Sequence, residues 1–321
     1  MKKATLSFAV AFAVSGMSLF MLSGCGKANV EKQYIKIVVT TFPIYDWTRE
    51  VLGGRLAESD LVLLQQSGAD LHSYSPSVAD LRKIAACDLF MSVGGDSDGW
   101  TERALAQQVN PRRRVLNLVK TLGSAAKEEK VVEGMDHDND DHEHEIDEHV
   151  WLSLRHSATF VKAVAAELAA IDPANAVTYH ANADAYCAKL VALDREYDGT
   201  VSGAKRKTIL VADRFPFRYL ADDYGIEYFA AFSGCSAESE ASFKTIASLA
   251  KKVDELNLPV ILTMEGTQHK IAETVRRTTK TKDQRILTLD SLQSTGGEAA
   301  EAMHYLNAMK RNLEVLKAAL N

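Results

Sequence analysis

The stretch DPANAVTYHANADAYCAKLVALDREYDGTVS, residues 172–202, decides the fold of this chain. Asp172 followed by Pro173 is a strong helix start, because aspartate is a favoured N-cap and proline suits the first helical position. From residue 174 onward one helical face recurs every three or four residues, with no glycine before Gly199. That face consists of Val177, His180, Ala183, Cys187, Leu190, Leu193, Tyr197 and Val201. At 1.5 Å per residue the helix would reach about 40 Å, so we interpret it as a rigid strut between two lobes. The alternative is an ordinary long surface helix within one domain.

Short apolar runs on both sides of this helix indicate buried strands. Those before it are 35–43, 61–64, 88–93 and 115–119, and those after it are 208–212, 226–232, 259–264 and 285–289. They alternate with segments of helical spacing, which is typical of parallel sheets covered on both faces. The predicted fold class is therefore α/β, with two Rossmann-like lobes, parallel sheets flanked by helices, and one long rigid helix joining them.

The expected division has a signal segment at 1–25, a first lobe at 26–171, a linker helix at 172–202 and a second lobe at 203–321. A chain of 321 residues is long enough for each lobe to hold a core of its own. One undivided core is less expected.

The N-terminus indicates a secreted lipoprotein. Lys2 and Lys3 precede an apolar run at 4–21, and Leu-Ser-Gly-Cys follows at 22–25. A lipobox of this kind predicts cleavage and lipidation of Cys25, which would anchor the chain to the outer face of the cell membrane. If an outer membrane exists, this is its periplasmic side. A single transmembrane anchor is the alternative.

Charge and cysteine content exclude two classes of protein. The formal net charge is −6, and removal of Lys2 and Lys3 would take it to −8, so nucleic acid is not an expected partner. With Cys25 lipidated, three cysteines remain, Cys87, Cys187 and Cys235, without close spacing. This pattern does not support a disulfide framework.

A second informative stretch is MDHDNDDHEHEIDEHVWL, residues 135–152. Imidazoles among carboxylates suit the capture of zinc-like ions, so we interpret 135–148 as a metal-collecting loop. Its collectors are His137, His142 and His144; a solvated acidic loop with incidental histidines is the alternative. His149 differs, because the Val-Trp-Leu that follows should anchor it as a ligand of fixed geometry. A zincin-type protease is not indicated, because His144 precedes His149 by five residues instead of four.

Polar residues follow several of the expected strands. Ligands of parallel sheets bind beyond the carboxyl ends of the strands, so these residues should converge on one edge. In the second lobe they are Asp213, Arg214, Cys235, Glu238, Glu240, Glu265 and Asp290. In the first lobe His72 lies in the loop GADLHSYSP, where Gly68 and Pro76 mark a turn.

The chain resembles the solute-binding lipoproteins of zinc and manganese ABC importers, which form the cluster with two lobes joined by one long helix. The resemblance covers nearly all of the mature chain. It rests on TTFPIYDWTREVLGG, GADLHSYSPSVADLRKIAACDLFMSVG, DEHVWLSLRHS, IDPANAVTYHANADAYCAKLVALD, FRYLADDYGI and YLNAMKRNLEVLKAAL. It implies a metal site between the lobes, with His72 and His149 as ligands and Asp290 as a late aspartate ligand.

The third metal ligand that the resemblance implies is missing from this chain. Where the family has His or Glu, this chain has Arg214 in ADRFPFRYL, and a guanidinium has no lone pair for a cation. Three replacements are open. First, Glu240 could bind the metal while Arg214 orients a carboxylate of Asp290 or Glu238. Second, Cys235 could bind as a thiolate, which would favour zinc. Third, Arg214 could bind an anion or a metal chelate.

The resemblance implies an extracytoplasmic binding protein that captures a divalent metal and delivers it to the membrane subunit of an ABC permease. We expect zinc in preference to manganese, a monomer, and no enzymatic activity. The alternatives are a surface metal-buffering or adhesion lipoprotein and, less favoured, a metallohydrolase.

Overall fold

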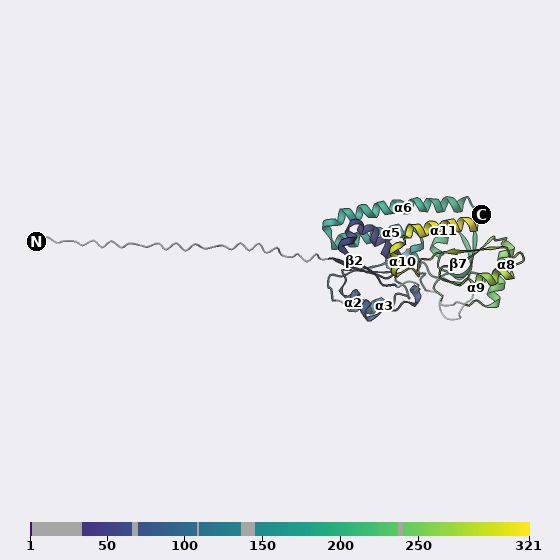
Figure 1. Ribbon diagram of the computed structural model, residues 1–321, viewed down its shortest axis with the longest axis horizontal. Helices are drawn as coiled ribbons and strands as arrows, with labels where there is room; N and C mark the ends of the chain where they lie inside the picture. The colour runs from purple at the N-terminus through teal and green to yellow at the C-terminus, as the bar shows by residue number, and fades with distance from the viewer. Residues whose placement is uncertain (2–33, 66–69, 108, 136–144, 237–239) are drawn as a thin grey trace. The chain divides into compact units, whose positions relative to one another are not determined.

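A computed structural model of the chain describes residues 1, 34–65, 70–107, 109–135, 145–236 and 240–321. The folded unit Tyr34–Asn321 contains two four-stranded sheets, and every strand pairing in them is parallel. Helices flank both sheets, and a long helix, α6, runs beside them (Figure 1). The predicted α/β class with two lobes is confirmed.

The elements of the first lobe and of the long helix follow the expected order. They are β1 Ile35–Val39, α1 Phe42–Leu52, β2 Ser59–Leu63, α2 Val78–Ala86, β3 Leu89–Ser92, α3 Trp100–Ala106, β4 Arg114–Asn117, α4 Leu118–Leu122, α5 Leu154–Ile171 and α6 Ala176–Ser202. The second lobe contains β5 Thr208–Phe215, α7 Arg218–Tyr224, β6 Glu227–Ser233, α8 Phe243–Leu256, β7 Val260–Met264, α9 Lys270–Thr278, β8 Arg285–Leu289, α10 Gly297–Ala302 and α11 Tyr305–Leu320.

The two sheets share one strand order, β2-β1-β3-β4 in the first and β6-β5-β7-β8 in the second. In each sheet the chain leaves the first strand toward one edge and later returns to the other side of that strand. A parallel sheet opens a binding crevice at this switch point, beyond the carboxyl ends of its strands. The loops that follow the strands are therefore the place to look for a site.

The long helix is present, but it begins later than the sequence predicted. Pro173–Asn175 forms a 3-10 turn, and α6 starts at Ala176. Asp172 makes no N-cap hydrogen bond and instead accepts one from the Tyr179 hydroxyl at 2.8 Å. The predicted face was wrong in the first turns, because Val177 is 84% exposed and His180 is exposed. From Ala183 onward the predicted face is buried.

The hydrophobic core does not divide between the lobes as expected. One cluster of buried side chains includes Ile37 of β1, Val211 of β5 and Leu190 of α6. The reason is that α6 packs against α1, α5 and α11, so apolar faces from both lobes meet beside it. Two smaller clusters lie within single lobes.

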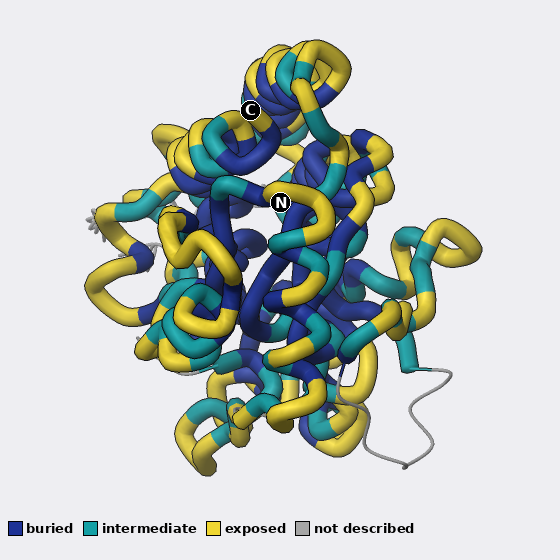
Figure 2. The backbone as a smooth tube through the Cα atoms, turned by 90° about the vertical axis from the view of Figure 1, so that its right-hand side faces the viewer, coloured by how far each residue is buried: buried dark blue, intermediate teal, exposed yellow. Residues whose placement is uncertain are grey.

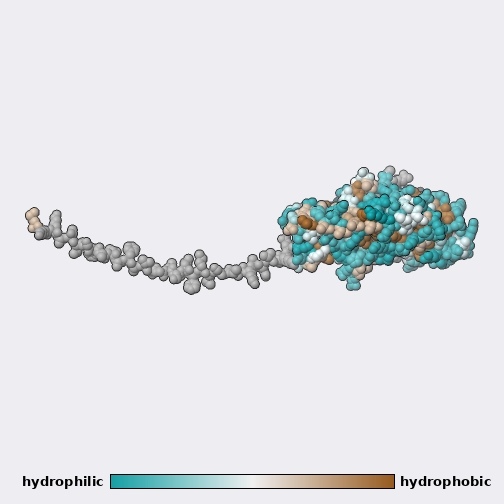
Figure 3. All heavy atoms as spheres, turned by 90° about the horizontal axis from the view of Figure 1, so that it is seen from above, coloured by the Kyte–Doolittle hydropathy of each residue, from teal (hydrophilic) through white to brown (hydrophobic). Residues whose placement is uncertain are grey.

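Burial is greatest where the strands pass through the unit, and exposed backbone lies mainly on the surrounding helices and loops (Figure 2). The face in Figure 3 is largely hydrophilic, with apolar residues scattered over it. None of the helices among the described residues is both long enough and apolar enough to cross a membrane. Apart from Met1, the signal segment 1–25 with Cys25 lies outside the described residues, so lipidation stays a prediction.

Candidate metal centre

His72 lies in the turn η2, Leu71–Ser73, in the chain segment that follows β2. Asp70 caps this turn by accepting the His72 backbone N–H at 3.0 Å. The His72 Nδ1 lies 2.7 Å from Ser97 Oγ in the loop after β3. Ser97 is held in turn by Glu148, whose carboxylate accepts its backbone N–H at 2.7 Å. When Nδ1–H donates to Ser97, the Nε2 lone pair is available to a metal.

His149 immediately precedes the turn η5, Val150–Leu152, and is fully buried with all three turn residues. The prediction that Val-Trp-Leu anchors this histidine is confirmed. Trp151 donates its Nε1–H to the Ser291 carbonyl of the second lobe at 2.8 Å. The His149 Nδ1 lies 3.0 Å from Asp147 Oδ1, which also accepts the His149 backbone N–H at 2.9 Å. Asp147 therefore fixes the ring and leaves Nε2 facing the site.

The two imidazoles meet through their Nε2 atoms, which lie 3.3 Å apart. In a tetrahedral zinc site with Zn–N bonds of about 2.05 Å, two nitrogen ligands are separated by about 3.3 Å. The spacing of His72 and His149 is therefore that of two ligands to one zinc ion. Each ring has its outer nitrogen held by a partner, so the pair is set in this geometry by the surrounding protein.

The pKa values of the two histidines shift in opposite directions. Burial and the neighbouring His149 lower the pKa of His72 to about 3, so this ring is neutral at pH 7. Burial alone would lower the pKa of His149 as well, but the carboxylates of Asp147, Glu129 and Glu148 raise it above its ordinary value. The negative charge of these carboxylates favours a positive charge at the position where the two rings meet.

Other donors lie close to the histidine pair. Ligand atoms of His72, Glu148 and Cys235 lie within 4.8 Å of one another, and so do those of Glu129, His149 and Cys235. Cys235 comes just after β6, and Glu129 comes from the chain segment that pairs with residues 145–147. Both lobes therefore contribute donors to one place.

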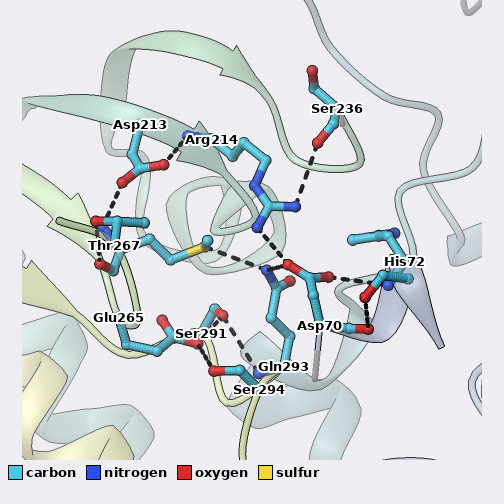
Figure 4. Close-up of polar contacts among 12 residues, drawn as sticks. Asp70, His72, Asp213, Arg214, Ser236, Glu265, Thr267, Ser291, Gln293 and Ser294 are labelled. Atoms are coloured by element: carbon cyan, nitrogen blue, oxygen red, sulfur yellow. Dashed lines mark hydrogen bonds and ion pairs between the residues drawn. The ribbon is translucent and has the colours of Figure 1, made fainter. Parts of the chain in front are cut away.

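Arg214 lies near the end of β5, and both terminal nitrogens of its guanidinium donate hydrogen bonds within the protein. One terminal nitrogen donates to Asp70 Oδ2 at 2.5 Å, and the other donates to the Ser236 carbonyl at 3.3 Å. Gln293 also donates to Asp70 Oδ2, at 3.2 Å. Figure 4 shows Arg214 and Gln293 reaching Asp70 together. The predicted partners of Arg214 were Asp290 or Glu238, and the observed partner is Asp70.

The structure does not bring Glu240 or Asp290 to the histidine pair. Glu240 is exposed. Asp290 directs its oxygens to the Leu292 backbone N–H at 3.0 Å and to Arg311 at 3.5 Å, because it caps the turn after β8. Among the described residues neither joins a group of three metal donors. From the same turn it is Gln293 that reaches His149, with its Oε1 2.9 Å from Nε2.

Four of the predicted metal-binding residues lie outside the described residues. They are Glu238 and the loop histidines His137, His142 and His144, and their roles stay predictions.

Five residues of the site were not predicted from the sequence: Glu129, Asp147, Glu148, Ser97 and Gln293. Asp147 and Glu148 adjoin His149, so their proximity was open to inference. Glu129 and Ser97 are brought in by tertiary pairing, which no local pattern of the sequence records.

A second donor group consists of Asp46, Glu50 and His304. Arg49 forms an ion pair with Asp46, and its guanidinium lies 3.2 Å from His304 Nδ1. A guanidinium in this position already neutralises the carboxylate. We therefore attribute this group to packing of α1 against α11.

The chain is similar to known proteins along most of its length. The sequence profile of the ZnuA family, described as zinc-uptake complex component A, periplasmic, matches residues 37–319. The zinc-binding protein AdcA of Streptococcus pyogenes serotype M1 is 29% identical over 292 residues, which cover 88% of this chain and 55% of AdcA. The chain thus spans about half the length of this relative. The high-affinity zinc uptake system protein ZnuA of Bacillus subtilis is 29% identical, with 92% of this chain and 90% of that protein covered.

Solved structures of similar proteins share the fold. The crystal structure of the Zn(II)-bound ZnuA-like domain of Streptococcus pneumoniae AdcA has a TM-score of 0.71 at 27% identity, covering 90% of this chain and 99% of that domain. The laminin-binding protein Lmb of Streptococcus agalactiae, described as having adhesin and metal-transporting activity, has a TM-score of 0.70 at 27% identity, covering 90% of this chain and all of that one. Since the profile match extends over most of the sequence, the chain belongs to the zinc-uptake complex component A family.

Proposed function

We propose that this chain is the extracytoplasmic component of an ABC importer that captures zinc between its lobes and delivers it to the permease. The observation that carries the proposal is the distance of 3.3 Å between the Nε2 atoms of His72 and His149. Both rings are oriented by partners on Nδ1, and both are largely or fully buried. Zinc is the transported ligand here, so the site has to bind and release the ion without catalysing a reaction.

Zinc is favoured over manganese by the chemistry of the donors. Two imidazoles with a cysteine beside them suit a borderline-soft ion, whereas manganese prefers oxygen ligands. The names of the relatives from Streptococcus pyogenes and Bacillus subtilis, both zinc proteins, support the same choice.

Release to the permease follows from the way the lobes are joined. α6 runs beside both lobes and contacts α1, α5 and α11, which restricts motion to small displacements. We infer that contact with the permease loosens the ligands of one lobe, and that the binding protein acts as a monomer. Equal separation of the lobes in metal-bound, metal-free and permease-bound forms would count against this release step.

Attachment to the membrane is proposed through Cys25. A relative from Streptococcus pneumoniae named a zinc-binding lipoprotein supports this assignment. Cells expressing the chain and fed a labelled fatty acid should label it, and Cys25→Ala should abolish the label. Label retained in the variant would place the lipid elsewhere.

Adhesion is a second proposal, because the Streptococcus agalactiae relative is described as an adhesin as well as a metal transporter. Binding of the purified protein to immobilised laminin tests this proposal directly. If the protein does not bind laminin either with or without zinc, the adhesion proposal is wrong. The family consists of solute-binding receptors and not of enzymes, so the metallohydrolase alternative is not retained.

The test of the main proposal is a competition for metal. The purified protein, and a variant with His137, His142 and His144 all changed to alanine, are offered zinc and manganese together against a chelator. We expect one tightly bound zinc per chain in both proteins. If tight binding disappears with the three loop histidines, the chain is a surface metal buffer and the inter-lobe site is not its function.

A further inference from the structure

The proposed zinc site around His72 and His149, here called the cargo site, lacks one ligand that the family resemblance implies. Other residues must therefore supply the remaining donors to the ion. Zinc in proteins is usually four-coordinate, and His72 and His149 supply two positions. Arg214 stands in the position of a third ligand but has no lone pair, and its terminal nitrogens already donate to Asp70 and to a backbone carbonyl. The remaining donors must therefore come from residues that face the two Nε2 atoms.

Cys235 is placed where such a donor is required. It is mostly buried in the loop after β6, and its ligand atom lies within 4.8 Å of a ligand atom from each histidine. A tetrahedral site with a Zn–S bond of about 2.3 Å separates sulfur from nitrogen by about 3.6 Å, so the sulfur–nitrogen distance has to shorten by at most about 1.2 Å when an ion binds. Backbone contacts fix the loop, because Glu129 accepts the Cys235 N–H at 3.1 Å and the Gly234 N–H at 3.3 Å.

Glu129 offers the fourth donor. One of its oxygens lies within 4.8 Å of ligand atoms of both His149 and Cys235. A carboxylate has more lone pairs than the two backbone N–H groups occupy, so Glu129 can hold the Cys235 loop and bind a metal together. Its segment is tied to the histidine side of the site, since the Glu129 N–H donates to the Glu145 carbonyl at 2.7 Å.

An independent observation, two buried carboxylate oxygens, points to a cation at this place. Glu148 is 2% exposed, and its Oε2 has no hydrogen-bond partner among the residues that the structure describes. The same atom lies 3.7 Å from His72 Nδ1, and a Glu148 oxygen is within 4.8 Å of the Cys235 donor. Asp147 Oδ2, beside His149, is likewise buried without a partner in the described part of the chain. Buried carboxylate oxygens left in this state are costly unless a positive charge joins them.

We propose that the Cys235 thiolate and the Glu129 carboxylate complete the cargo site, giving an ion bound by two nitrogens, one sulfur and one oxygen. The inference rests on the proposed function, since it assumes that His72 and His149 hold the cargo. As the zinc–sulfur bond forms, the S–H bond of Cys235 breaks and its proton passes to water, with no change of oxidation state. A thiolate ligand makes this member of the family selective for thiophilic ions, zinc and cadmium, over manganese.

Cobalt(II) substitution tests the proposal without dependence on any variant. A cobalt–thiolate bond gives an intense near-ultraviolet charge-transfer absorption that imidazole and carboxylate ligands do not give, so the loop histidines cannot produce it. We expect the purified wild-type protein to show this absorption at one equivalent of cobalt and to lose it when zinc is added. Cys235→Ser should lose the band, whereas the matched variant Cys187→Ser, at a buried cysteine of α6, should keep it.

Glu129→Gln tests the oxygen ligand in the same way. The variant should keep the sulfur band and change the visible ligand-field absorption, and an unchanged visible spectrum would remove Glu129 from the ligand set. Tight cobalt binding that depends on His72 and His149 but shows no sulfur band would overturn the Cys235 ligand and leave the proposed function intact. Absence of tight cobalt and zinc binding would overturn both.

Discussion

Arg214 of β5 and Asp70 of the first lobe form an ion pair across the two lobes, with guanidinium nitrogen and carboxylate oxygen 2.5 Å apart. The other oxygen of Asp70 accepts the His72 backbone N–H. Arg214, which the sequence predicts at the position of a family ligand, is therefore linked through one carboxylate to a histidine of the proposed site. Arg214 thus positions the turn that carries His72.

A double-mutant cycle on this pair measures how strongly the lobes are coupled. Burial alone would raise the pKa of Asp70, but Arg214 holds it below its ordinary value. Stability from this carboxylate is therefore present above its unfolded pKa and is lost as pH falls through its folded pKa. We expect Arg214→Gln to lower the unfolding free energy by about 1 to 2 kcal/mol at pH 7, with less further loss when Asp70→Asn is added. Strictly additive effects in urea titrations would show that the pair does not couple the lobes.

Ser97→Ala tests how the His72 ring is oriented. Ser97 Oγ is the partner of His72 Nδ1 at 2.7 Å, so its loss frees the ring to rotate and to change tautomer. We expect zinc affinity to fall by about 10- to 100-fold, the range found for partners of metal-binding histidines. Ser73→Ala is the control, because Ser73 Oγ donates to the Asp70 carbonyl and does not touch the imidazole. Equal zinc affinities of Ser97→Ala and Ser73→Ala would contradict the role of Ser97 in orienting the His72 ring.

The buried carboxyl group of Asp98 should make the free energy of unfolding depend on pH. It is 2% exposed, its Oδ2 accepts the Gly94 N–H at 2.9 Å, and burial raises its pKa from 3.8 to about 6. Because the pKa of Asp98 is higher in the folded state than in the unfolded state, the folded state binds more protons between pH 3.8 and about 6. Ionisation of Asp98 therefore lowers stability as pH rises from about 4 to 6.

Asp98→Asn removes this ionisation. The variant should be more stable than wild type at pH 7, by up to about 3 kcal/mol, and the two should converge near pH 4. The exposed neighbour Asp96→Asn should behave as wild type. Thermal unfolding at several pH values gives the comparison, and a destabilised Asp98→Asn at neutral pH would refute it.

The face of α6 that supports the lobes can be checked with two truncations. Leu190 is fully buried in the main core, whereas Val177 is 84% exposed. We expect Leu190→Ala to cost about 2 to 5 kcal/mol of unfolding free energy and Val177→Ala to stay within about 0.5 kcal/mol. Similar costs for both would mean that the helix is packed on a different face.

Most of the fold could be predicted from the sequence because its signals are local. Strand β8 lies where its β-branched and apolar run lies, and β1 and α6 differ from their predicted ranges mainly at the ends. The first turns of α6 were misjudged because Asp172 binds Tyr179 instead of capping the helix. The shared core was not predictable, because it arises from helices that pack on both lobes at once.

The candidate site was predictable only in part. His72 and His149 follow from motifs, and the structure brings their rings together. The environment of Arg214 depends on Asp70, which is 144 residues away in sequence, and Glu129 reaches Cys235 across 106 residues. No spacing rule covers pairs of this kind, so Glu129 could not be predicted from the sequence, whereas Cys235 was one of the replacements that the sequence left open.

The most direct test of the account is a chelator-competition titration of zinc into wild type, His72→Ala, His149→Ala and His180→Ala. His180 is an exposed histidine of α6 and serves as the matched control. We expect one tight zinc site in wild type and His180→Ala, and loss of that site in both His72→Ala and His149→Ala while each variant remains folded by circular dichroism. Tight binding of one zinc by folded His72→Ala and His149→Ala would contradict it.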